Sequence, residues 1–157
     1  MEHIKDLPLL QMTAESLMVS SEKVAHVQLN NPLEHALLIL VTSGYSAIPV
    51  LDTRYKFKGI IGKNAILNEI LGLERFEMER LSEVTVEDVL MRDIPSVNKS
   101  DHFLTCLKNV LDHPFLCVVD QEGNFDGIVT RREILKQLNK YIHVNKELFT
   151  ELSEGEK

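Results

Sequence analysis

The chain has 157 residues, 44% hydrophobic and 26% charged, which is typical of a folded protein and not of a disordered one. Its net charge of −7 argues against nucleic-acid or anionic-membrane binding, because each needs a basic surface. The longest apolar run, residues 36–41, is too short to cross a bilayer. No export signal is apparent, so we expect a cytoplasmic protein.

The first half of the chain has the pattern strand, helix, strand, strand, helix. Short apolar runs followed by turns mark the strands, and apolar residues at helical spacing mark the helices. A short helix capped by Thr13 precedes this pattern. The hairpin over residues 52–56 lacks glycine and is expected to be loose. The five elements are predicted at 24–29, 33–44, 47–52, 57–61 and 63–72.

The second half repeats this order. Gly59 and Gly127 begin matching strand ends that run directly into helix starts, and they lie 68 positions apart. Thr85 and Asp88 form a capping pair that corresponds to the cap at Thr13. The hairpin over 120–124 carries Gly123 where a tight turn needs it. Its five elements are predicted at 94–98, 103–111, 115–120, 125–129 and 131–142.

Repetition of one unit at constant spacing predicts the fold class and its divisions. We expect an α/β protein of two tandem β-α-β-β-α repeats packed as one pseudo-symmetric pair, since one such unit alone buries too little surface. Leu73, Phe76 and Leu81 lie on one helical stripe and predict a helical connector. The divisions are 12–73 for repeat 1, 74–84 for the connector, 85–143 for repeat 2 and 144–157 for a polar C-terminal tail.

The two repeats differ at the start of the closing helix. The second has Thr130, Arg131, Arg132 and Glu133, whereas the first has residues 62–65 with the sequence GKNA. Threonine followed three residues later by glutamate is also an ordinary helix capping box. Two arginines at a helix start oppose the helix dipole, however, and a bound phosphate would relieve that repulsion. The alternative is that both guanidiniums point into water or pair with nearby acids.

No catalytic or metal motif accompanies this corner. The sequence has no phosphate-binding glycine loop, nucleophile elbow or zinc-binding histidine pair. Cys106 and Cys117 have no metal or redox spacing and are expected to be buried thiols. The six histidines, His26 among them, are scattered. We therefore expect a protein that is not an enzyme and has no metal or cofactor.

The strand-to-turn sequences resemble those of the CBS domain, named after cystathionine β-synthase. The resemblance is carried by residues 44–52 (GYSAIPVLD), 59–61 (GII), 118–120 (VVD) and 127–130 (GIVT), and it covers residues 12–143. Because a pair stands here without an attached enzyme, the chain further resembles the small cyclic-di-AMP-binding CBS proteins of Gram-positive bacteria. Glu133 departs from the family pattern, which has aspartate at that position.

The resemblance implies a nucleotide cleft between the repeats. The adenine would lie against the first strand and the entry to the second strand of one repeat, and the ribose and phosphate would meet the helix start of the other. Without a ligand, Tyr45 would be a turn aromatic, Ala25 a small core residue and Lys23 a solvated lysine. The symmetric cleft, with Pro95, Ser96, His113 and Pro114 facing 62–65, is expected to be empty or weak. The implied nucleotide site comprises Lys23, Ala25, His26, Val27, Tyr45, Ser46, Ala47, Thr130, Arg131, Arg132 and Glu133.

The implied function is that of a non-enzymatic sensor. It would bind cyclic di-AMP and regulate a cytosolic partner, a (p)ppGpp synthetase/hydrolase or pyruvate carboxylase, according to ligand state. A homodimer is expected by analogy with other CBS pairs, with no nucleic-acid or membrane partner. The alternatives are an energy sensor that binds AMP, ADP or ATP in the same cleft, and a ligand-free structural dimerisation module.

Overall fold

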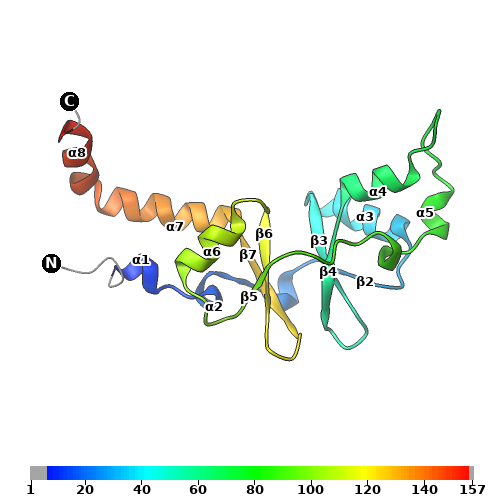
Figure 1. The fold of residues 1–157 in the computed structure, drawn as a ribbon, viewed down its shortest axis with the longest axis horizontal. Coiled ribbons are helices and arrows are strands. Elements are labelled where there is room, and N and C mark those ends of the chain that lie inside the picture. Colours follow the sequence, from blue (N-terminus) through cyan, green and yellow to red (C-terminus); the bar gives the residue numbers. More distant parts are fainter. Residues whose placement is uncertain (1–6, 156–157) are drawn as a thin grey trace.

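The computed structural model describes residues 7–155 and shows an elongated molecule with two α/β halves side by side (Figure 1). Both halves have the predicted order of strand, helix, strand, strand, helix. The first half contains β2 (Val27–Gln28), α3 (Leu33–Ser43), β3 (Ala47–Leu51), β4 (Phe57–Gly62) and α4 (Lys63–Ile70). The second contains β5 (Ser96–Val97), α6 (Phe103–Val110), β6 (Phe115–Val119), β7 (Phe125–Thr130) and α7 (Arg131–Val144).

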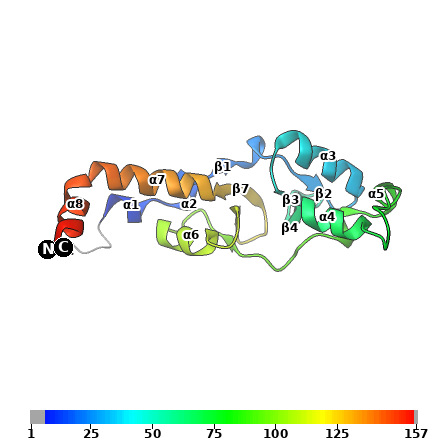
Figure 2. The same cartoon turned by 90° about the horizontal axis from the view of Figure 1, so that it is seen from above.

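Further elements precede, join and follow the two halves. The opening strands β2 and β5 are shorter than predicted, while α7 is longer. Residues of the predicted polar tail form a helix that leads away from the body (Figure 2). These elements are α1 (Pro8–Gln11), α2 (Ala14–Leu17), β1 (Val19–Ser20), the 3-10 helices η2 (Ser21–Lys23) and η3 (Val86–Asp88), α5 (Arg80–Glu83) and α8 (Lys146–Gly155).

Two sheets form the centre of the molecule. The first has the order β2-β3-β4, and the second has the order β1-β7-β6-β5. In both, the short opening strand runs parallel to the next strand, with Val27 opposite Val50 and Val97 opposite Val118. The long strands pair antiparallel through hairpins. The internal repeat in the sequence therefore corresponds to a repeat in the topology.

Each half receives a helical turn from outside its own repeat. Ala14 and Leu17 of α2 are buried in the second core with Phe103 and Ile134. Val86 of η3 is buried in the first core. Both turns start with the predicted threonine caps, in which the side chains of Thr13 and Thr85 form reciprocal capping boxes with residues three positions later. The two cores therefore depend on each other.

The repeated glycines allow a crossing segment to approach the sheet. Strand β1 pairs with β7, and a Cβ atom added to Gly127 would lie 2.2 Å from the carbonyl oxygen of Val19. In the first half, a Cβ added to Gly59 would lie 2.3 Å from the carbonyl oxygen of Met91. Only glycine leaves room for such contact of backbone with backbone.

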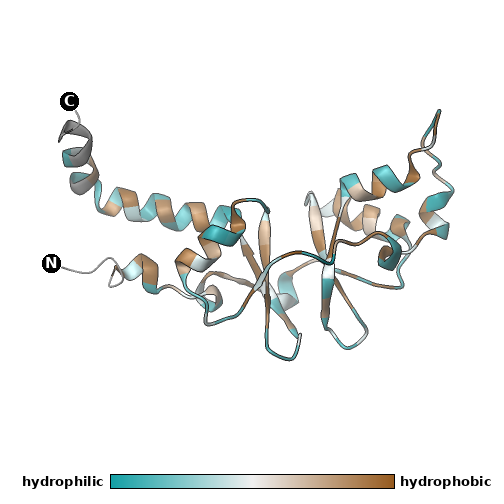
Figure 3. Cartoon of the chain, in the orientation of Figure 1, coloured by the Kyte–Doolittle hydropathy of each residue, from teal (hydrophilic) through white to brown (hydrophobic). Residues whose placement is uncertain are grey.

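The two sheets pack face to face through a third apolar cluster. Val24, Ile60, Phe125 and Ile128 are buried there, and the rings of Phe57 and Phe125 stack with their centroids 6.4 Å apart. Much of the length of these strands is coloured as hydrophobic, whereas the helices alternate between hydrophobic and hydrophilic residues (Figure 3). The halves thus share an interface as well as exchanging elements.

The hairpin tips join the two halves at one end of the sheets. Lys56 donates from Nζ to the Glu122 carbonyl at 2.9 Å, and the Phe57 amide donates to the Gly123 carbonyl at 2.9 Å. Tyr55 occupies the left-handed conformation (φ 66°) at the position equivalent to Gly123 (φ 87°). The expectation of a loose hairpin is therefore wrong. The first hairpin keeps the tight geometry because the Asp52 carboxylate accepts two backbone N–H bonds, as Asp120 does in the second hairpin.

The segment predicted as a helical connector is helical only over Arg80–Glu83. Before it, Leu71 pairs with Phe76, and the Gly72 amide donates to the Arg75 carbonyl at 2.8 Å, so the chain makes a tight turn. Of the three residues on the predicted stripe, only Leu81 is buried. The spacing of apolar residues was compatible with a helix, but backbone groups near Gly72 form their hydrogen bonds within a turn instead.

Candidate nucleotide cleft

A narrow cleft lies between the two sheets, at the end away from the hairpin tips. Ala25, Tyr45 and Ala47 contribute from the first half, and Phe115 and Ile128 from the second. The cleft holds about 10 Å³, which is roughly the space for one water molecule. Tyr45 is 50% exposed at its mouth, and a purine base would have to displace such side chains. The remaining lining residues are Val24, Ile48 and Pro49.

The start of α7 lies beside this cleft. Thr130 pairs across the sheet with Phe115, one of the cleft residues, and it is the N-cap of α7. Its hydroxyl accepts a hydrogen bond from the Glu133 amide at 3.0 Å. The Glu133 carboxylate instead accepts from Gln137 Nε2 at 2.9 Å. Only half of the capping box forms, and the glutamate points along its own helix.

Arg131 already has partners within the protein. Its Nε donates to the Val110 carbonyl at 3.2 Å, and its Nη2 donates to the Leu111 carbonyl at 3.4 Å. These carbonyls lie at the C-terminal end of α6, where the helix dipole favours a cation. The Arg131 amide also donates to the Pro114 carbonyl at 2.9 Å. Proximity to α6 therefore offsets the repulsion that the sequence predicts at the start of α7.

Arg132 is the cation of this corner that remains available. It is exposed, and among residues 7–155 no hydrogen bond or ion pair engages its guanidinium. Together with Arg131, Lys136 and Asn139 it lines an open hollow along α7. Sequence reasoning missed Lys136, although its position one helical turn after Arg132 places both on one face.

The other predicted residues lie in three different surroundings. Lys23 is exposed at the end of η2, which packs against β7. Ser46 is exposed, and its carbonyl accepts from the Lys63 amide at 3.1 Å. The His26 ring packs edge-on against Tyr55 at 5.2 Å, and Val27 is buried in the first core. The structure therefore brings Ala25, Tyr45 and Ala47 to the cleft, but His26 and Val27 do not line it.

The symmetric corner is chemically poorer. Gly62 is the N-cap of α4 and supplies no side-chain hydrogen bond. The Lys63 amide repeats the backbone contact made by Arg131, but the Lys63 side chain makes no recorded bond to the end of α3 within residues 7–155. This corner has neither the hydroxyl of Thr130 nor a carboxylate at position 65. That it is empty or weak stays a prediction.

Reactive groups are sparse in the part of the chain that the structure describes. Residues 7–155 contain no cluster of histidine, cysteine and acidic side chains suited to a metal ion. Burial raises the pKa of the Cys106 thiol to about 11 and raises that of Cys117 further, so both thiols stay protonated. No helix among these residues has the length and apolar character needed to cross a membrane.

Two α/β repeats that exchange helical turns, with a cleft between their sheets, define a tandem α/β module. The model of the CBS domain matches residues 14–72 and again residues 86–140. The chain therefore belongs to the CBS-domain family.

Several known proteins are similar to most of this chain. Cyclic di-AMP receptor B of Bacillus subtilis is 49% identical over 134 residues, which is 85% of this chain and 91% of that protein. A CBS domain-containing protein of unknown function from Bacillus anthracis has a crystal structure with a TM-score of 0.80 at 57% identity, covering 84% of this chain and 96% of that one. Listeria monocytogenes CbpB in complex with c-di-AMP has a TM-score of 0.76 at 53% identity, covering 81% and 95%.

Proposed function

We propose that this protein is a cytoplasmic, non-enzymatic sensor that binds cyclic di-AMP in the cleft between its repeats. The observation that carries the proposal is the corner formed by Thr130 and Arg132 beside the apolar cleft at Phe115. It combines the Thr130 hydroxyl, a guanidinium with no partner among residues 7–155 and a helix start with an apolar cleft surface. A phosphate next to an adenine needs this combination. Similar proteins are named for the same ligand.

In this proposal the two halves of the site have different tasks. Ala25, Tyr45 and Ala47 hold the base, because small residues allow close approach to the strand and an aromatic ring can stack on the purine. Arg132 binds a phosphate, and Lys23 supplies a second cation. The set predicted from the sequence is Lys23, Ala25, His26, Val27, Tyr45, Ser46, Ala47, Thr130, Arg131, Arg132 and Glu133. Of these, His26 and Val27 lie outside the lining of the narrow cleft, so their part in the proposed site requires the cleft to widen.

Ligand binding can regulate a partner only if the free and bound forms differ. The cleft has room for about one water molecule, so a base must widen it or move Tyr45. A phosphate that recruits Arg131 would also remove its bonds to the end of α6. We propose that the partner, a (p)ppGpp synthetase/hydrolase with pyruvate carboxylase as a second candidate, binds the form with the narrow cleft.

Isothermal titration calorimetry tests the ligand. We expect cyclic di-AMP to bind more tightly than AMP, ADP or ATP. Arg132→Ala should weaken binding about 10- to 150-fold, since a hydrogen bond to a charged group contributes about 1.5–3 kcal/mol. Arg54→Ala is the matched control, because this exposed arginine lies on a hairpin far from the cleft. Tighter binding of AMP or ATP would instead identify an energy sensor, and absence of nucleotide binding would leave a dimerisation module.

A second measurement tests the partner. The activity of a purified (p)ppGpp synthetase/hydrolase should rise when this CBS-domain protein is added, and it should fall back when cyclic di-AMP is then added. The Arg132→Ala variant should stimulate the enzyme but respond less to the nucleotide. Stimulation that cyclic di-AMP does not change would contradict coupling between the cleft and the partner surface.

A further inference from the structure

The solvent face of α7 carries a line of basic side chains, which we call the α7 basic stripe and define as Arg132, Lys136 and Lys140. They follow one another at intervals of four residues, and all three are exposed. They lie on the side of the helix opposite Ile134, which is buried in the second core. Within the part of the chain that the structure describes, none of the three forms an ion pair or a side-chain hydrogen bond.

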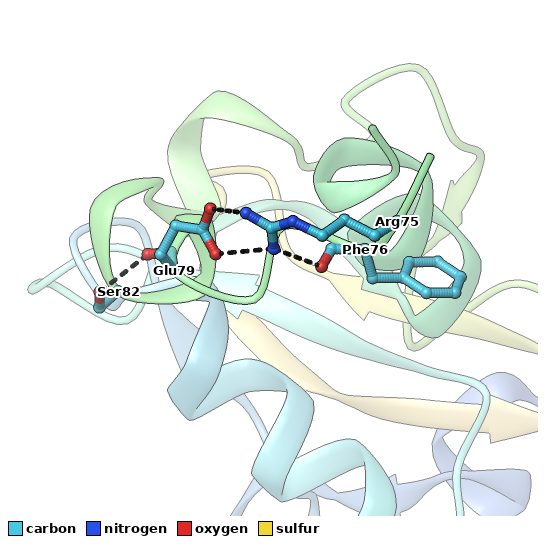
Figure 4. Close-up of polar contacts among 4 residues, drawn as sticks. All are labelled: Arg75, Phe76, Glu79 and Ser82. Carbon is cyan, nitrogen blue, oxygen red and sulfur yellow. Dashed lines mark hydrogen bonds and ion pairs between the residues drawn. The ribbon is translucent and has the colours of Figure 1, made fainter. Parts of the chain in front are cut away.

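The connector shows how this chain neutralises an exposed arginine elsewhere. Arg75 donates to both oxygens of the Glu79 carboxylate, at 2.8 and 3.3 Å, and to the Phe76 carbonyl at 3.1 Å (Figure 4). Arg80 likewise pairs with Glu69 at 2.6 Å. The α7 basic stripe has no such internal partner in residues 7–155, so its charge is available to another molecule.

The stripe is also unfavourable for the helix that carries it. Like charges four residues apart destabilise a helix, and Arg132 in the first turn opposes the helix dipole as well. The acid of α7, Glu133, does not compensate, because its carboxylate accepts from Gln137 Nε2 at 2.9 Å. Departures from a local rule of this kind are expected where a surface binds something.

The first repeat provides an internal comparison. At the offset of 68 residues, the three stripe positions correspond to Asn64, Asn68 and Gly72. Helix α4 ends at Ile70, whereas α7 continues to Val144, so the third cation lies on the part of α7 that has no counterpart. A closing helix of this fold therefore does not require cations on its outer face. The stripe is a property of the second repeat alone.

The spacing of the stripe indicates the shape of its partner. With a rise of 1.5 Å per residue, successive cations lie about 6 Å apart along α7. An extended chain places alternate side chains on one face at about 6.6 Å, so carboxylates at every second residue would meet the cations in register. An open hollow of about 550 Å³ runs along this part of α7 and offers room for such a chain. It is lined by Arg131, Arg132, Leu135, Lys136 and Asn139.

The charge of the whole protein distinguishes between anionic partners. A nucleic acid carries a phosphate at every nucleotide and extends beyond the stripe, where a protein of net charge −7 repels it. A short acidic stretch of protein contacts the stripe and little else. Charge complementarity therefore favours an acidic protein segment.

We propose that the α7 basic stripe is the docking surface for an extended acidic segment of a partner protein, with carboxylates at alternate residues. Arg132 also belongs to the proposed phosphate site, so cyclic di-AMP and the acidic segment would compete for one guanidinium. The competition rests on the proposed function, whereas the docking surface does not. Competition gives the nucleotide a direct way to release the partner.

Amide NMR spectra of the isotope-labelled full-length protein test the docking surface. The probe is a peptide with blocked ends that alternates glutamate and alanine over about seven residues, which is longer than the stripe. We expect saturable shifts within residues 131–143 at low salt. They should disappear in about 1 M salt, where the screening length falls to about 3 Å. A peptide with glutamine in place of glutamate should cause no such shifts.

Charge reversal provides matched variants. Lys136→Glu combined with Lys140→Glu should weaken peptide binding about tenfold, because two surface ion pairs are lost and two repulsions are added. Arg54→Glu, exposed on a hairpin, is the control and should bind the peptide as the wild type does. Unchanged binding in the double variant, or shifts outside α7, would overturn the proposal. So would tighter binding of a single-stranded oligonucleotide than of the acidic peptide.

A competition measurement separates this inference from the proposed function. Cyclic di-AMP added to the wild-type complex should displace the peptide. Lys140→Glu should leave nucleotide affinity unchanged in calorimetry, because Lys140 lies about 12 Å along α7 from Arg132. Nucleotide binding without displacement would refute the competition. Peptide binding without any nucleotide binding would refute the proposed function and support the docking surface.

Discussion

At the scale of single residues, the two arginines at the start of α7 have different surroundings. Arg131 donates to carbonyls at the end of α6, whereas Arg132 has no partner among residues 7–155. The sequence showed that both were unfavourable for the helix dipole, but it could not show that the end of another helix lies beside one of them. Sequence distance conceals this contact, because Val110 precedes Arg131 by 21 positions.

The difference predicts unequal effects of the two substitutions on the free energy of unfolding. Arg131→Ala should lower the free energy of unfolding by about 1 kcal/mol, since it removes hydrogen bonds to a helix C-terminus. Arg132→Ala should change it by less than about 0.5 kcal/mol, as for an unpaired surface side chain. Urea denaturation of both variants without nucleotide measures the two values. Equal losses would contradict the assignment of Arg131 as the arginine that tethers α6.

The hairpin aspartates predict how stability depends on pH. Hydrogen bonds from Asn124 and from backbone amides lower the pKa of Asp120 below its usual 3.8, and backbone hydrogen bonds led by that of Lys56 lower the pKa of Asp52. A lowered folded-state pKa contributes stability that is present above the unfolded-state pKa and is lost as pH falls through the folded-state value. Asp120→Asn keeps an acceptor oxygen but cannot titrate. Its stability should therefore fall less steeply below about pH 4 than that of the wild type.

At the scale of elements, the repeated glycines show why the two strand ends share one sequence pattern. Gly127 lets β1 cross β7 at close range, and Gly59 does the same for the segment at Met91. A side chain at either position would push the neighbouring backbone segment away from the sheet. These glycines therefore support the cleft indirectly, because β1 leads into η2 and Ala25.

A substitution at Gly127 tests this role. Gly127→Ala should destabilise the protein by about 1–3 kcal/mol, the usual cost of overpacking, because its Cβ would lie 2.2 Å from a carbonyl oxygen. Gly62→Ala is the matched control, since its nearest contact would be a less severe 3.2 Å. Thermal unfolding followed by circular dichroism compares the two. A similar loss in both variants would mean that the crossing does not require glycine.

Local patterning predicted the order of the ten main elements, but not the crossings between the repeats. The caps at Thr13 and Thr85 were recognisable because capping acts within four residues. Helix α2 packs in the second core, and η3 packs in the first. These contacts join residues far apart in the sequence, so no local sequence pattern predicts them. The connector was mispredicted for a related reason: Leu73 and Phe76 have helical spacing, yet the chain turns at Gly72 and leaves both exposed.

At the scale of the whole molecule, the exchanged turns and the shared interface between the sheets predict cooperative unfolding. Neither core is complete without the other half. Differential scanning calorimetry should show one transition, with equal calorimetric and van't Hoff enthalpies for the cooperative unit. Saturating cyclic di-AMP should raise the midpoint temperature of that single transition, because a ligand that binds only the folded state stabilises it by mass action. Two separate transitions would contradict the interdependence of the cores.

The bonds between the hairpin tips restrict how the molecule can deform. Lys56 and Phe57 tie the first hairpin to the second, whereas the cleft lies at the other end of strands β3 and β6, about 16 Å away for five extended residues. A ligand that separates the strands at the cleft would rotate the two halves relative to each other about the hydrogen-bonded hairpin tips. Helices that lie far from the hairpin tips would then move further than the strands. A bound small molecule could therefore change the surface that this protein presents to a partner.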